Sequence, residues 1–253
     1  MISLLVPVDG APTTKVPLDY LETHTIGRTV ENDIVLEHPG VSRRHLHLIR
    51  DGFTVFVEDL GSANGTYVNG ELQPRRARFE PGDRLRVGGY PHELTLEERL
   101  LTPDELGTYA ALALSGEEQR LVHADALEME GQLDVANWLR LEVELRRHER
   151  GTPAFLHAQH ELAEAAKKVL PRWRALLART PIERCSRGFC PREWSKLLLT
   201  PRPHKRSCSV CKAEVTFCDT LNEARARHPA LLVIDPARVR RPYDVAPPPM
   251  PVG

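Results

Sequence analysis

Four short polar signatures follow one another between Ile26 and Gly70, each at the point where one apolar run gives way to the next. They are Ile26-Gly27-Arg28, Asn32-Asp33-Ile34, Val41-Ser42-Arg43-Arg44-His45 and the stretch from Asp59 to Gly70. Together they place guanidinium groups, a hydroxyl and a carboxamide on turns between strands. These donors are the groups needed to hold a phosphate and the peptide that carries it.

Arg28 and Ser42 are the residues best suited to contact a phosphate. An arginine on a turn presents a planar fork that can grip two oxygens at once. A neighbouring serine hydroxyl and free loop N–H groups complete the cradle. Because a phosphothreonine carries roughly −1.5 to −2 charges and three strong acceptor oxygens, it suits such an arrangement.

With these four signatures in this order, residues 1–98 resemble a forkhead-associated (FHA) domain, the module that binds phosphothreonine peptides. The resemblance implies that Arg28 and Ser42 contact the phosphate and that Arg43 assists. It also implies that the side-chain amide of Asn64 holds the ligand backbone, next to the backbone of Ala63. The remaining signature residues are implied to support the loops rather than to touch the ligand: Gly27, His45, Gly65 and Asn69.

No catalytic apparatus is expected in residues 1–98. Ser42 and His45 share a loop, but the sequence suggests no acid that would orient the imidazole for nucleophilic catalysis. The resemblance gives no reason to expect hydrolysis either. We therefore predict a binding module and not an enzyme.

Short strands must position these residues, and together they predict a β-sandwich for residues 1–98. Turn-forming pairs separate the apolar runs, and Asn69-Gly70 indicates a type I′ hairpin because both central residues of that turn need positive φ. The expected strands are Ile2–Val6, His24–Ile26, Ile34–Leu36, Leu46–Ile49, Phe53–Asp59, Thr66–Val68, Arg84–Val87 and His92–Leu96.

The pattern becomes helical at Thr102 and predicts a helical spacer over residues 102–180. Thr102-Pro103-Asp104-Glu105 predicts a capping box, and Ser115-Gly116-Glu117-Glu118 predicts a second one. Further signals are Gly131 as the end of the second helix, a third helix from Leu133 to near Gly151, and a fourth over Ala154 to Arg179 that Pro171 interrupts.

Part of this spacer resembles a short helical companion module of multidomain bacterial proteins, notably those of planctomycetes and myxobacteria. The similarity lies in the stretches Gln119–Gly131 and Ala136–Glu142 and covers about residues 103–146. It implies a pair of helices and a bacterial source.

All five cysteines lie between Cys185 and Cys218, within a small α+β segment predicted for residues 184–240. The Cys208-x2-Cys211 pair can form one half of a tetrahedral thiolate site. We predict a structural zinc site, against the alternatives of reduced structural cysteines and a thiol–disulfide switch. The predicted ligands are Cys190, Cys208, Cys211 and Cys218, with Cys185 and His204 as alternates.

Composition places the chain among proteins of the cytoplasm. It lacks an apolar run of about 20 residues and a signal peptide, so no membrane association is expected.

Residues 1–98 hold 10 Lys/Arg against 15 Asp/Glu, a net charge of −5, whereas residues 180–253 hold 13 against 7, a net charge of +6. The Pro-rich tail, residues 241–253, is predicted to be extended or disordered.

These observations predict a phosphothreonine-reading adaptor that acts downstream of Ser/Thr kinases. Its partner would be a phosphothreonine-containing protein, either a Ser/Thr kinase or a kinase substrate. One alternative is a structural subunit that uses the sandwich for phosphate-independent assembly. Another is a nucleic-acid regulator acting through the basic Cys-rich segment, which is disfavoured because its basic residues are scattered and not arranged in a stripe.

Overall fold

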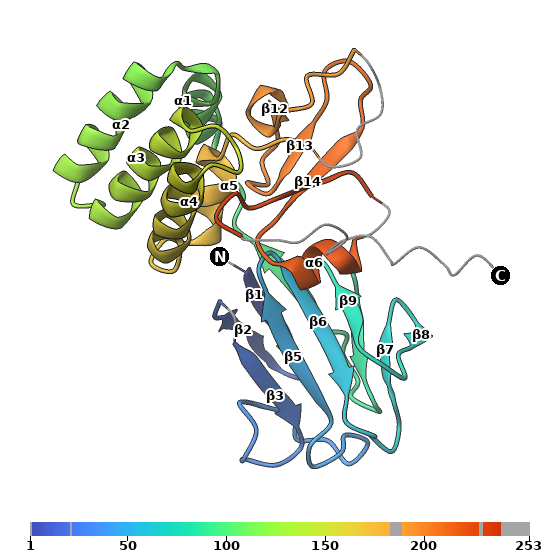
Figure 1. Cartoon of the computed structure of the whole chain (residues 1–253). Coiled ribbons are helices and arrows are strands. Elements are labelled where there is room, and N and C mark those ends of the chain that lie inside the picture. Colours follow the sequence, from blue (N-terminus) through green and yellow to red (C-terminus); the bar gives the residue numbers. More distant parts are fainter. Residues whose placement is uncertain (1, 21, 183–188, 228–229, 239–253) are drawn as a thin grey trace. The chain divides into compact units, whose positions relative to one another are not determined.

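The computed structural model describes residues 2–20, 22–182, 189–227 and 230–238. It divides into two compact units, Met1–Arg99 and Leu100–Gly253 (Figure 1). The sequence predicted two segments for the second unit, 102–180 and 184–240, and both belong to that one unit. The predicted tail, 241–253, lies outside the described residues. Among the described helices, none is both long and apolar enough to span a bilayer.

The first unit is a β-sandwich, as its sequence predicts. One layer has the strand order β4-β3-β5-β6-β9, and the other contains two three-stranded sheets, β11-β1-β2 and β10-β7-β8. A bridge between Leu85 and Leu94 joins these two small sheets. The strands are β1 (Ile2–Val8), β2 (Ala11–Leu18), β3 (Thr23–Gly27), β4 (Ile34–Val35), β5 (Leu46–Asp51), β6 (Thr54–Asp59), β7 (Thr66–Val68), β8 (Glu71–Leu72), β9 (Ala77–Phe79), β10 (Leu85–Val87) and β11 (Thr95–Glu98).

Alternation along the strands builds the core of this unit. Leu46 and Leu48 of β5 are fully buried, whereas His47 between them is half-buried. Apolar side chains from both layers form one buried cluster, and Leu4 of β1 and Ile26 of β3 belong to it. This common core holds the strand ends, and therefore the loops between them, at defined positions.

Two local features show how the sequence sets the strands. Asn69 has φ 52° and Gly70 has φ 84°, so both central residues of the β7–β8 turn are left-handed and the predicted type I′ signal is confirmed. Strand β2, which contains Pro12 and Pro17, is not among the strands that the sequence predicted. The strand tolerates both prolines because it pairs only with β1 and forms the edge of its sheet.

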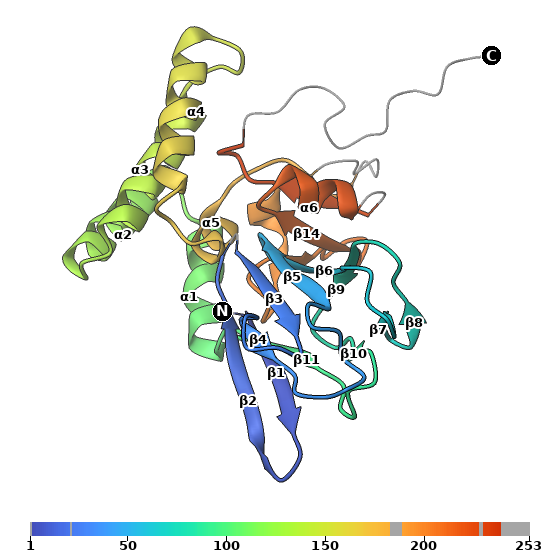
Figure 2. The same ribbon diagram turned by 90° about the horizontal axis from the view of Figure 1, so that it is seen from below.

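The second unit begins with five helices, α1 (Pro103–Leu114), α2 (Glu117–Met129), α3 (Leu133–Arg147), α4 (Pro153–Ala166) and α5 (Pro171–Leu177). Figures 1 and 2 show α3 beside both α2 and α4. The capping box at Thr102 is present, and Pro171 splits the predicted fourth helix as expected. The second predicted capping box is wrong. Gly116 is the N-cap of α2 and has no side chain to offer, while the Ser115 hydroxyl donates to Leu112 O over 2.8 Å.

The predicted α+β region follows these helices and packs against them. Its sheet has the order β12-β13-β14-β15, with strands at Leu198–Leu199, Lys205–Ser207, Glu214–Cys218 and Leu232–Ile234, plus a 3-10 turn at Trp194–Lys196 and α6 at Leu221–Ala226. Arg174 of α5, 1% exposed, forms ion pairs with Asp219 and Asp235 at the ends of β14 and β15. This buried cluster ties the helices to the sheet.

Candidate functional site

Three loops of the sandwich meet around one hollow of about 800 Å³. The first loop follows β3, the second precedes β5, and the third joins β6 to β7. The residues that line the hollow include all five predicted to contact a phosphopeptide: Arg28, Ser42, Arg43, Ala63 and Asn64. The fold thus brings together side chains that are separated by up to 36 positions in the sequence.

The first two loops are tied together at Gly27 and Asn32. Arg28 N–H donates to Ser42 O over 2.9 Å, and the buried Asn32 side chain donates to Arg43 O over 2.7 Å and to Thr29 O over 2.8 Å. A Cβ on Gly27 would lie 2.2 Å from Arg43 O, so only glycine allows this approach. Asn32 belongs to one of the four signatures, but its role follows only from the structure, in which its side chain links the two loops.

His45 joins the second loop to the third. Its imidazole is fully buried, with Nδ1 accepting the N–H of Ser42 over 3.1 Å and Nε2 lying 3.1 Å from Gly65 O. Since a carbonyl can only accept, the ring must carry its proton on Nε2. Burial lowers the pKa of His45 and keeps this imidazole neutral.

This geometry does not form a nucleophile–base pair. The sequence predicted no acid that could orient His45, but Asp59 Oδ2 lies 3.9 Å from Nε2 of the imidazole. However, Asp59 accepts from the N–H groups of Gly61 and Ser62 and from the hydroxyls of Ser62 and Thr66. The other imidazole nitrogen faces the backbone of Ser42, not its hydroxyl. The carboxylate therefore organises the third loop.

The hydroxyl of Ser42 is oriented by the third loop. Ala63 N–H donates to Ser42 Oγ over 3.1 Å. This bond occupies an acceptor position of the oxygen and leaves the O–H proton free to be donated elsewhere. Ser42 is half-buried and lines the hollow, so its donor is available to a molecule bound there.

Positive charge in the hollow is not neutralised by the protein. Arg28, Arg43 and Arg44 are exposed, and their side chains have no hydrogen bond or ion pair with any residue that the structure describes. Glu31 is the one acidic residue among the described residues that line the hollow. Three unpaired guanidinium groups in a unit of net negative charge mark a local site for an anion.

Asn64 and Asn69 have different places in the fold. Asn64 is an exposed lining residue whose Nδ2 donates to Gly40 O over 2.9 Å. Asn69 does not line the hollow. Its side chain donates to Asp83 Oδ1 over 2.8 Å and accepts Arg84 N–H over 3.0 Å, which fixes the loop before β10. Gly65, with φ 73°, continues the third loop beyond Asn64 and presents its carbonyl to His45.

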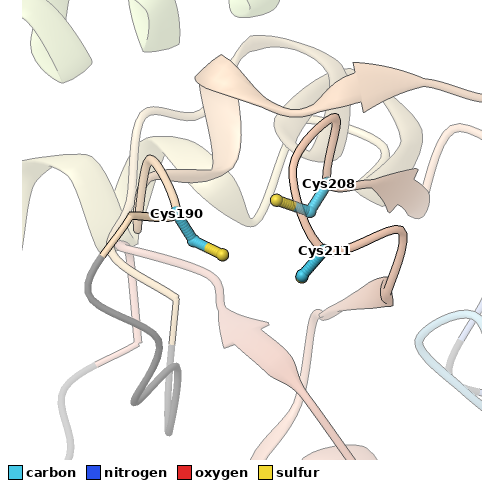
Figure 3. A group of neighbouring side chains, drawn as sticks. All are labelled: Cys190, Cys208 and Cys211. Atoms are coloured by element: carbon cyan, nitrogen blue, oxygen red, sulfur yellow. The ribbon is translucent and has the colours of Figure 1, made fainter.

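Three of the four predicted metal ligands lie together in the second unit. The sulfur atoms of Cys190, Cys208 and Cys211 are all within 4.8 Å of one another (Figure 3). The structure does not bring Cys218 to this group. Cys218 ends β14, is fully buried, and packs in an apolar cluster with Ala224, Leu232 and Ile234.

The two alternate ligands have different outcomes. Cys185 lies outside the described residues, and His204 is buried but is not a member of the group. Within the group, the backbone N–H groups of Cys211 and Val210 donate to Cys208 and lower the pKa of that thiol to about 7.

Residues 24–88 match the family model of the FHA domain, so the N-terminal domain of this chain belongs to the FHA family. The helical companion module and the Cys-rich segment have no counterpart in this match, which ends at residue 88.

Similar proteins match the same region. An oxoglutarate dehydrogenase inhibitor of Corynebacterium diphtheriae is 44% identical over 69 residues, which are 27% of this chain and 47% of the relative. The transcriptional regulatory protein EmbR of Mycobacterium tuberculosis is 36% identical over 81 residues, 32% of this chain and 20% of the relative. These matches thus span half or less of the curated relatives.

Solved structures match it as well. A chain from a structural and functional analysis of phosphothreonine-dependent FHA domain interactions is 30% identical, with a TM-score of 0.34. The match covers 40% of this chain and 98% of that one.

Proposed function

We propose that the first unit binds phosphothreonine peptides and that the protein acts as a signalling adaptor downstream of Ser/Thr kinases. In this role the FHA domain would bring a phosphorylated kinase, or a kinase substrate, to whatever the second unit binds. The match of residues 24–88 to the FHA family model supports the class of ligand, because the resemblance to an FHA domain implies a phosphothreonine peptide.

The observation that carries the proposal is the set of free donors around Ser42. The guanidinium groups of Arg28 and Arg43 have no partner in the described part of the chain, and the Ser42 hydroxyl accepts Ala63 N–H while its own proton stays free to be donated. A phosphate has three acceptor oxygens and no strong donor, so it complements these free donors.

Rigidity of the loops adds to this match. Donors that are already oriented bind an anion better than flexible surface charges, because less side-chain entropy is lost on binding. Here the backbone of Ser42 is held from both sides, by Arg28 N–H at its carbonyl and by His45 Nδ1 at its N–H. The hydroxyl is held in turn by Ala63.

Asn64 is placed to hold the peptide backbone. Its Nδ2 donates one proton to Gly40 O, and its Oδ1 has no hydrogen bond in the described part of the chain. A side-chain amide with a free acceptor and a second N–H can bond both groups of a peptide unit. The same bond to Gly40 keeps the amide at the edge of the hollow.

Calorimetric titration with a degenerate phosphothreonine peptide library, beside its unphosphorylated twin, tests the proposal. Each charge-assisted hydrogen bond lost is worth about 1.5–3 kcal/mol, so Arg28→Ala and Ser42→Ala should each weaken binding by at least about 10-fold. Arg84→Ala is the matched control, because Arg84 is an exposed arginine of the same unit that does not line the hollow.

Equal binding of the phosphorylated and unphosphorylated libraries would contradict the proposal and favour phosphate-independent assembly through the sandwich. The same conclusion would follow if Arg28→Ala bound the phosphorylated library as tightly as the parent protein and the Arg84→Ala control.

A further inference from the structure

The group of three cysteines in the second unit shares no residue with the hollow of the first unit. Cys208 and Cys211 lie on the turn between β13 and β14, and Cys190 comes from a segment that precedes β12. We propose that Cys190, Cys208 and Cys211 bind a zinc ion through their thiolates. This proposal does not depend on the function of the FHA domain.

The turn between β13 and β14 directs two thiols to the same side. Cys208 N–H donates to Ala213 O and Lys212 N–H donates to Cys208 O, each over 3.0 Å, so the chain closes tightly around Cys208-Ser-Val-Cys211. Lys212 has φ 61°, a left-handed conformation that is unfavourable for a residue with a Cβ. This backbone shape holds Cys208 and Cys211 ready to share a ligand.

Cys190 supplies the third sulfur from 18 positions earlier in the sequence. Figure 3 shows the sulfur atoms of Cys190 and Cys208 pointing toward each other across the space beside Cys211. Cys190 and Cys208 are 8% and 3% exposed, while Cys211 is half-buried. The group is therefore shielded on the side of the first two thiols and open to an ion on the side of the third.

The distances suit a tetrahedral metal. Zinc–sulfur bonds of about 2.3 Å at tetrahedral angles place two sulfur atoms about 3.8 Å apart. The three sulfur atoms lie within 4.8 Å of one another, so shifts of at most about 1 Å would complete the geometry. Soft thiolate ligands select zinc and similar soft metals over calcium or magnesium.

A disulfide would fit the group less well than a metal. All three thiols are free in the structure. A disulfide would join two sulfur atoms and leave the third as an unpaired thiol. A metal ion uses all three, and the fourth position of its tetrahedron accepts a ligand from outside the group, such as water.

A zinc ion bound at these thiols would have a structural role in the second unit. A bound metal stabilises the folded state, because the site is not formed in the unfolded chain. Binding at the three thiols would fasten the segment at Cys190 to the β13–β14 turn.

Metal content of the full-length protein tests the proposal. After exposure to Zn²⁺ with a thiol reductant and removal of free metal, the protein should retain about one zinc ion per chain. The double variant Cys208→Ser/Cys211→Ser should lose at least about nine tenths of it. Cys218→Ala is the matched control and should retain the metal, because Cys218 is a buried cysteine of the same region that lies outside the group.

A second measurement does not need the variants to fold. Titration of the reduced wild-type protein with Co²⁺ should give the absorption bands of tetrahedral thiolate coordination, and Zn²⁺ should abolish them. Alkylation with and without Zn²⁺ should show that the ion protects Cys190, Cys208 and Cys211. The proposal is wrong if the wild-type protein retains no zinc and shows no such bands, or if the double variant retains as much zinc as the parent.

Discussion

The backbone N–H of Ser42 donates to Nδ1 of His45 over 3.1 Å, so the residue whose hydroxyl faces the hollow is held by a buried imidazole. The opposite nitrogen of the same ring reaches Gly65 O. Both contacts require the neutral ring with its proton on Nε2. The orientation of Ser42 therefore depends on the protonation state of His45.

This relationship predicts a pH dependence of stability. The folded-state pKa of His45 is lowered by burial, whereas the imidazole of the unfolded chain titrates near its usual value of about 6.5. Above that pH both states are neutral and His45 adds no pH dependence. As the pH falls below about 6.5, the unfolded chain takes up the proton first, so the free energy of unfolding decreases until the folded-state pKa is reached.

Chemical denaturation of the full-length protein between pH 7.5 and 5 measures this loss, and the imidazole NMR signals report the titration of His45 directly. His45→Gln is the control, since its amide can accept and donate in the same places without titrating. A His45 signal that titrates at or above the value of a free imidazole would rule this prediction out.

Gly27→Ala should destabilise the first unit and weaken phosphopeptide binding. The added Cβ would lie 2.2 Å from Arg43 O and 2.7 Å from Asn32 Nδ2, so the two loops would have to separate. Overpacking of this kind costs about 1–3 kcal/mol. Urea denaturation and peptide titration check both effects. Gly107→Ala, in helix α1 with open space around it, should instead leave binding unchanged and raise stability by up to about 1 kcal/mol.

Arg174→Met should destabilise the second unit far more than Arg140→Met, although each arginine pairs with two acids. Arg174 is buried against Asp219 and Asp235, and its removal leaves those carboxylates without their shared guanidinium, at a cost of about 3–5 kcal/mol. Arg140 is 36% exposed and pairs with Asp125 and Glu128 in solvent, so its loss should cost about 1 kcal/mol or less. Denaturation curves of both variants measure the loss in the free energy of unfolding. Equal losses for Arg174→Met and Arg140→Met would show that burial of the ion pairs does not set their contribution to stability.

Asn64→Ala should separate peptide binding from phosphate binding. The variant loses the amide at the edge of the hollow but keeps Arg28 and Ser42. We expect phosphothreonine peptides to bind roughly 10-fold more weakly, because hydrogen bonds to the ligand backbone are lost, while the affinity for free phosphate stays the same. Competition of phosphate and peptide against a labelled phosphopeptide measures both, and a parallel loss of phosphate affinity would contradict the assigned role.

The sequence could predict the features that depend on neighbours along the chain. Alternating apolar residues predicted the sandwich, Asn69-Gly70 its tight turn, and Thr102 with Glu105 the first helix cap. Predictions failed where distant contacts decide. Strand β2 exists despite two prolines because it lies at a sheet edge, and Asp59 approaches His45 only through the pairing of β5 with β6.

The predicted metal ligands show the same limit. Spacing alone identified Cys208 and Cys211 as a pair, because both lie on one turn. Whether Cys190 or Cys218 joins them depends on how β14 and the segment before β12 fold, and side chains alternate along a strand. Cys218 lies at the end of β14 and enters the apolar cluster, whereas Cys190 reaches the turn.

By itself, then, the sequence determined the order of the signatures, the types of donor and the local turns that carry them, since these depend on residue type and short-range backbone preference. Only the tertiary structure decided which donors stay free. The side chains of Asn32 and His45 form their hydrogen bonds within the protein, while the guanidinium of Arg28 and the Ser42 hydroxyl remain available to a ligand. That division follows from burial, because a polar group shut away from water must find its partner within the fold.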